Sequence, residues 1–119
     1  TILFCHGLES GPHGRKVHAL VAAGFAVESP DCRGADLQTR VTRQHRCIVE
    51  APTPPLVVGS SFGGISGLLA AMLAQDDGVT VPGLVLCAPA LETPRPPALD
   101  RPLRCPAPII VVHGRSDEV

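Results

Sequence analysis

One serine of this sequence has the neighbours that nucleophilic chemistry needs. Ser61 lies between Gly59, two positions before it, and Gly63, two positions after it, and the motif separates an apolar run from a run rich in small residues. A strand, a sharp turn and a helix in this order hold a serine in a strained backbone conformation, which requires neighbours with almost no side chain. The alternative is a glycine-rich turn without a chemical role. The flanking runs favour a nucleophilic serine.

Two backbone amides are candidates for binding the negative charge that an attack by Ser61 would create. The segment His6-Gly7-Leu8 follows an apolar run, and a glycine directly after a strand lets the chain approach a ligand closely. The amide of Leu8 is therefore one candidate donor, and the amide of Phe62 is the other. A plain turn with a packed histidine is an equally common source of a His-Gly pair. This prediction therefore depends on the serine downstream.

A carboxylate that could orient a catalytic histidine follows the last apolar run. Asp117 lies four residues after His113, just beyond a predicted strand end. Asp31 also follows a predicted strand, but an aspartate in a turn usually binds its own backbone. His13 and His18 fall on a predicted helix, where we expect surface positions. Asp117 is thus the preferred acid.

Strands and helices alternate along the chain. Short apolar runs predict strands, and apolar residues at helical spacing predict helices. The predicted strands span 1–5, 25–30, 56–59, 83–88 and 109–112, and the predicted helices span 12–23, 36–50 and 62–74. Seven prolines between 89 and 108 exclude a helix longer than a turn or two there. This order indicates an α/β fold, a three-layer αβα sandwich whose mostly parallel sheet of about five strands carries its site at the strands' carboxyl ends.

The predicted helices differ in the faces that they would bury. The apolar face of the first comprises Val17, Leu20 and Val21, and Gly24 is placed to end that helix. The second has an apolar face of Leu37, Val41 and Ile48 and a polar side of Gln38, Arg40, Arg43 and Arg46. The third is apolar nearly all round, which predicts a central helix packed on the sheet.

Composition and charge limit the classes of protein to which this chain can belong. The chain of 119 residues is expected to form a single domain, 1–119, with a real core. Its net charge of −1, with scattered arginines, argues against a nucleic-acid partner. Since no apolar run approaches the roughly 20 residues of a membrane span, we expect no membrane association and a cytoplasmic location. The five cysteines are odd in number and widely spaced, so neither a disulfide framework nor a metal site is indicated.

These motifs together resemble those of the α/β-hydrolases, and within that superfamily the small, lidless esterase-like proteins of the YqiA type. Residues 3–7 are similar to the family's first strand and oxyanion loop, residues 59–64 to its nucleophile turn, and residues 113–119 to its acid-bearing strand end. The resemblance implies Ser61 as nucleophile, Asp117 as triad acid, and no cofactor. It also implies an oxyanion hole formed by the amides of Leu8 and Phe62, with His6, Gly7, Gly59 and Gly63 as supporting residues.

The sequence departs from the family pattern at one point. The family order is Ser, then Asp, then His, and no histidine follows Asp117. We therefore expect these residues to be a core that lacks the C-terminal strand, the loop with the catalytic histidine, and the first two strands of the full fold. The 119-residue chain alone is expected to self-associate through an uncovered edge at 109–112 and to show negligible esterase activity.

The function that these residues indicate is hydrolysis of a small acyl ester through an acyl-serine intermediate. A thioesterase, amidase or lactonase would use the same residues. The alternative class is a non-catalytic α/β-hydrolase relative that binds a small ligand or a protein partner. A strand and a histidine within about 20 to 40 residues after Asp117 in the full-length sequence would favour the enzyme.

Overall fold

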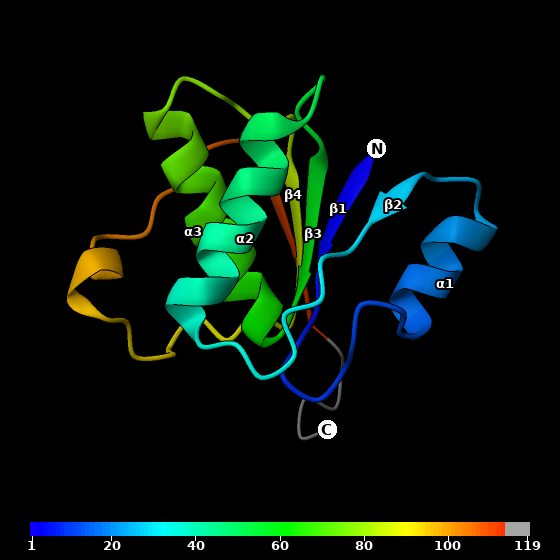
Figure 1. The fold of residues 1–119 in the computed structure, drawn as a ribbon, viewed down its shortest axis with the longest axis horizontal. Helices are drawn as coiled ribbons and strands as arrows, with labels where there is room; N and C mark the ends of the chain where they lie inside the picture. Colours follow the sequence, from blue (N-terminus) through cyan, green and yellow to red (C-terminus); the bar gives the residue numbers. More distant parts are fainter. Residues whose placement is uncertain (114–119) are drawn as a thin grey trace.

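A parallel sheet forms the middle of the molecule. The computed structural model describes residues 1–113. Within them, five strands pair in parallel in the order β2-β1-β3-β4-β5 (Figure 1). The strands are β1 (Ile2–Cys5), β2 (Val27–Glu28), β3 (Leu56–Ser60), β4 (Leu84–Cys87) and β5 (Ile109–Val112). The predicted α/β class, with its parallel sheet between helical layers, is confirmed.

Helices cover the two faces of the sheet unequally. Helix α1 (Arg15–Ala22) lies on one face, and α2 (Leu37–Glu50) and α3 (Phe62–Asp76) lie together on the other (Figure 1). We call these the α1 face and the α2/α3 face. On the α2/α3 face, α3 is buried between the sheet and α2, which explains why its sequence is apolar nearly all round.

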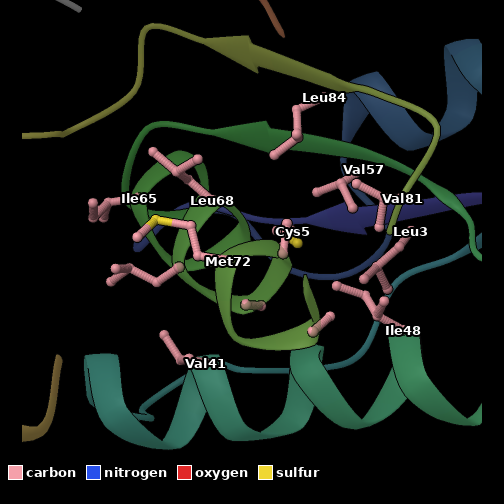
Figure 2. Close-up of a cluster of buried hydrophobic side chains, with 14 of the residues drawn as sticks. Leu3, Cys5, Val41, Ile48, Val57, Ile65, Leu68, Met72, Val81 and Leu84 are labelled. Atoms are coloured by element: carbon pink, nitrogen blue, oxygen red, sulfur yellow. The ribbon is translucent and has the colours of Figure 1, made fainter. Parts of the chain in front are cut away.

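The main core fills the α2/α3 face. Figure 2 shows side chains from β1, β3 and β4 meeting those of α2 and α3 in one cluster, which includes Leu3, Val41, Ile48, Val57, Ile65, Met72 and Leu84. The α1 face holds a smaller cluster of Ile2, Phe4, Val17 and Val58. Alternate residues of each strand therefore serve the two layers, as the pleat of a strand requires.

Local signals in the sequence account for the ends of the helices. Gly24 adopts φ +97°, its N–H binds the carbonyl of Val21 at 3.0 Å, and the N–H of Phe25 binds the carbonyl of Leu20 at 3.1 Å. This is a Schellman motif, so the predicted role of Gly24 is confirmed. Helix α2 begins after Asp36, whose carboxylate accepts a hydrogen bond from the N–H of Thr39 at 2.8 Å.

Two expectations about the α1 face are wrong. The predicted strand 25–30 is reduced to β2, because Phe25 completes the turn that ends α1 and its side chain is 52% exposed. Val21 was expected to be buried with Val17, but it is 54% exposed. The narrow apolar strip beneath the short helix α1 reaches Val17 and does not extend to Val21.

A third expectation is wrong on α2. Arg40, assigned to the polar side with Gln38 and Arg43, is completely buried. The helical positions that face the core run through Leu37, Arg40, Val41, Gln44 and Ile48, so spacing places Arg40 inside the molecule despite its charge.

The proline-rich segment 89–108 wraps around the end of α3. It holds a single 3₁₀ turn, Pro97–Leu99, which agrees with the expectation of no longer helix, and Leu99 inserts into the main core. The Asp76 carboxylate binds the guanidinium groups of Arg101 at 2.8 Å and Arg104 at 3.0 Å. These ion pairs tie the segment to α3.

No helix in the described part of the chain is long and apolar enough to cross a membrane.

Candidate active site

Sheet register brings four strand ends to one edge. Cys5 pairs with Gly59, Ser60 with Cys87, and Cys87 with Val112. The residues that follow these strands therefore lie along the carboxyl edge of the sheet, where parallel α/β folds place their sites. Ser61 and the loop that begins at His6 are among them.

Ser61 has the strained backbone that its motif predicts. Its φ is +56° and its ψ is −116°, a conformation that a residue with a side chain rarely adopts. Three hydrogen bonds hold it there: its N–H donates to the Cys87 carbonyl at 3.0 Å, and its carbonyl accepts from the N–H groups of Gly64 and Ala90, both at 2.9 Å. The side chain is exposed at the end of α3. The fold thus exposes Ser61 at the carboxyl edge of the sheet.

The glycines around Ser61 are required by close packing. A Cβ on Gly59 would lie 2.5 Å from the carbonyl oxygen of Gly63, and a Cβ on Gly63 would overlap the carbonyl of Cys5. A Cβ on Gly64 would lie 2.7 Å from that of Pro89. The first turn of α3 therefore lies directly against the ends of β1 and β3, which sets the position of Ser61.

A pocket of about 490 Å³ opens beside Ser61. Its lining comes from the β1–α1 loop, from α1 and from the end of β3: Gly7, Leu8, Glu9, Ser10, Lys16, Ser60 and Ser61. Phe62 begins α3, so its N–H is one of the donors that a helix leaves without an internal partner. Within residues 1–113, neither the N–H of Leu8 nor that of Phe62 donates a hydrogen bond. In this part of the chain, both amides are therefore without a protein acceptor.

His6 is buried, and both of its ring nitrogens are occupied. The N–H of Cys32 donates to His6 Nε2 at 2.8 Å, so Nδ1 carries the proton and donates to the Gly7 carbonyl at 2.8 Å. A ring held in this way cannot accept a proton from Ser61 without losing the bond to Cys32. His6 thus has a structural place under the loop, and it is not positioned as a general base.

Arg40 lies beneath the same loop and was missed in the sequence. Its Nη1 donates to the His6 carbonyl at 2.6 Å, its Nη2 to the Gly7 carbonyl at 3.3 Å, and its Nε to the Ala35 carbonyl at 3.4 Å. The guanidinium carbon also lies 4.9 Å from the centre of the Phe62 ring. Burial lowers the pKa of Arg40 below its ordinary value, although an arginine remains charged at neutral pH. The helical spacing of α2 was the signal that could have found it.

The two candidate acids have different outcomes. Asp31 binds the guanidinium of Arg33 at 2.6 Å and accepts a hydrogen bond from the backbone N–H of Arg33 at 3.0 Å. These bonds from Arg33 hold the pKa of Asp31 well below its usual range. Asp31 therefore has the turn role that its sequence context suggested. Asp117 lies outside the described residues.

Two of the other pockets lie farther from Ser61. One of about 420 Å³ is lined by Pro89, Leu91, Thr93, Val111 and His113, so the proline-rich segment forms a wall there. Another of about 530 Å³ lies at the opposite, amino-terminal edge of the strands and includes Cys47. Burial and the nearby Glu28 raise the pKa of the Cys47 thiol to about 11, so it is a poor nucleophile at neutral pH.

The described residues hold no group of three or more side chains placed to bind a metal ion. Cys5, at the end of β1, is fully buried, and this burial raises the pKa of its thiol. Cys5 is therefore a poor candidate nucleophile beside the exposed Ser61.

Comparison with known proteins agrees with this architecture. The model of the alpha/beta hydrolase family matches residues 2–117, and the chain belongs to that family. A solved structure described as a YdeN-like hydrolase, from Pectobacterium atrosepticum, is similar in fold, with a TM-score of 0.61 and 20% sequence identity. The similarity covers 93% of this chain and 60% of that one, so the chain spans about three fifths of its length. No curated protein matches the chain.

Proposed function

We propose that the protein is a serine hydrolase that cleaves a small carboxylic ester through an acyl-serine intermediate. Ser61 attacks the ester carbonyl, and the amides of Leu8 and Phe62 bind the oxyanion that forms. The alcohol leaves with a proton from the general base. Water then attacks the acyl-serine, the acid is released and Ser61 recovers its proton.

The observation that carries this proposal is the backbone of Ser61. A positive φ at a residue with a side chain costs stability, and such strain clusters at functional positions. Ser61 lines a pocket together with Leu8 and directly precedes Phe62, and within residues 1–113 the N–H groups of Leu8 and Phe62 donate no hydrogen bond. Membership in the alpha/beta hydrolase family supports the same chemistry.

The remaining members of the catalytic triad are proposed from the sequence. Asp117, five positions after the last residue of β5 in the sequence, orients the imidazole of the general base. We propose a histidine other than His6 as the base, because both ring nitrogens of His6 are engaged. The family order of Ser, Asp and His would place this histidine after Asp117. The substrate is a small or aliphatic acyl ester, and a thioester, amide or lactone is accommodated by the same chemistry.

A fluorophosphonate probe tests the nucleophile, because it reacts with an activated serine hydroxyl and leaves the enzyme phosphonylated. The intact protein is expected to be labelled, and Ser61→Ala to abolish the labelling. Ser60→Ala is the matched control and should label normally, since Ser60 ends β3 and lacks the strained turn. Labelling that persists in Ser61→Ala would refute the assignment, and an unlabelled wild-type protein would favour a non-catalytic relative.

The acid has its own test. Asp117→Asn in the intact protein should lower kcat on p-nitrophenyl acetate by orders of magnitude and change KM much less, because the imidazole would lose its orientation. Asp31→Asn is the control and should leave kcat unchanged. A drop of less than tenfold in Asp117→Asn would assign the acid elsewhere.

A further inference from the structure

We propose that Arg40 is a positioning residue that holds both halves of the oxyanion hole in one arrangement. This inference rests on the proposed function, since it concerns the same site. The guanidinium lies under the β1–α1 loop that carries the Leu8 amide and also against the ring of Phe62, the residue that carries the second amide. One side chain from α2 therefore contacts both donor segments.

The hydrogen bonds define the direction of the Leu8 N–H. The peptide group between Gly7 and Leu8 is trans, so its C=O and N–H point in opposite directions. Its C=O accepts from Arg40 Nη2 at 3.3 Å and from His6 Nδ1 at 2.8 Å, both in the interior. The N–H of Leu8 is consequently directed away from Arg40, toward the side of the loop that lines the pocket with Ser61.

The same bonds strengthen the donor. When a peptide C=O accepts hydrogen bonds, the peptide group becomes more polarised and its N–H donates more strongly. The Gly7–Leu8 peptide accepts two such bonds, one of them from a cation. The preceding peptide is held as well, because its C=O accepts from Arg40 Nη1 at 2.6 Å and its N–H donates to Ser10 Oγ at 3.1 Å. The loop is fixed before any substrate arrives.

The burial of Arg40 shows that the arrangement is a costly one for the fold. A fully buried guanidinium loses its hydration, and within residues 1–113 it forms no ion pair with a carboxylate. Its partners are backbone carbonyls and an aromatic face. A leucine or methionine at this place in α2 would fill the space without desolvating a charge. The hydrogen bonds that Arg40 donates to carbonyls of the β1–α1 loop explain why a charged residue occupies this position.

The test uses Arg40→Met, which keeps much of the volume, and Arg40→Lys, which keeps the charge but loses the planar fork. With p-nitrophenyl acetate as substrate, Arg40→Met in the intact protein should lower kcat about 10²-fold and change KM less than about threefold, since a misplaced oxyanion donor affects the transition state. The kcat of Arg40→Lys should be higher than that of Arg40→Met and within about tenfold of the wild-type value. Arg46→Met, on an exposed position of the same helix, should behave as the wild type.

A second measurement separates positioning from general stability. Hydrogen exchange of residues 6–10 should accelerate in Arg40→Met while exchange in α3 stays as in the wild type, at a temperature where the variant is folded. If Arg40→Met unfolds, Arg40→Lys provides both measurements.

Wild-type kcat and unchanged loop exchange in the variants would overturn this inference and leave the proposed function standing. Equal acceleration across α3 and the loop would overturn it too, by assigning Arg40 to the core alone. A wild-type protein that neither turns over the ester nor reacts with the fluorophosphonate would refute the proposed function instead.

Discussion

The two faces of the sheet differ in how much they bury and in what depends on them. On the α2/α3 face, the side chains of three strands and two helices form one continuous core (Figure 2). The α1 face buries four residues, and on the same side the β5 residues Ile110 and Val112 are exposed. Ser61 directly precedes α3 and Arg40 belongs to α2, so the candidate site is held by the well-packed face. The candidate site thus lies on the side of the sheet that has the larger core.

The strongest test of this comparison is a substitution at the contact between α3 and the sheet. Gly63→Ala would place a methyl group on the Cys5 carbonyl, and we expect it to destabilise the fold by more than about 4 kcal/mol or to prevent folding. Gly78→Ala is the matched control. It has φ +83° and open space, so its cost should be about 1 kcal/mol. Urea unfolding measures both, and equal losses would contradict the close packing of α3.

Substitutions of one apolar side chain on α3 and one on α1 compare the two faces. Leu69, on α3, is 1% exposed, and Leu69→Ala should lower the free energy of unfolding by about 3 kcal/mol through the cavity that it leaves. Val21, on α1, is half exposed, and Val21→Ala should change it by less than about 0.5 kcal/mol. Similar values for the two variants would mean that the α1 face is as well packed as the other.

The outer edge of β5 gives a prediction about association. Within residues 1–113, β5 pairs only with β4, and the side chain of Ile110 is 64% exposed. An apolar edge strand with free backbone groups favours pairing with another copy. The 119-residue chain should therefore self-associate, and Ile110→Lys should shift it toward the monomer in sedimentation velocity. A wild-type chain that is monomeric at all concentrations would refute this.

The smallest effect concerns the ion pairs that fasten the proline-rich segment to α3. The guanidinium groups of Arg101 and Arg104 hold the pKa of the Asp76 carboxyl below its ordinary value of 3.8. A lowered pKa in the folded state contributes stability above about pH 4, and this contribution is lost as the pH falls through the folded-state pKa. Asp76→Asn should lower Tm slightly at pH 7 and have no effect at pH 2. Glu92→Gln is the control, and salt should reduce the difference. A difference that persists at pH 2 would contradict this origin.

Much of the fold was predictable because strands of β-branched residues alternate with helices whose ends carry clear signals. The strained turn at Ser61 was predictable too, since Gly59 and Gly63 mark a place where α3 packs too closely on the sheet for any side chain. The burial of Arg40 was not predicted, because charged side chains are seldom buried, although the helical position of Arg40 faces the core. A guanidinium can be buried where backbone carbonyls converge, and the sequence of α2 does not show that the carbonyls of His6 and Gly7 lie next to it. Phe25 was placed in a strand because β propensity does not record that a helix cap takes its N–H.

The backbone of Ser61 also bears on how this sequence can change over generations. A glycine would adopt φ +56° without strain, so replacing the serine should make the protein more stable while removing the hydroxyl. Selection for folding alone would therefore remove serine from this position. The proposed role of Ser61 therefore predicts that a lineage released from the need for turnover acquires glycine here early.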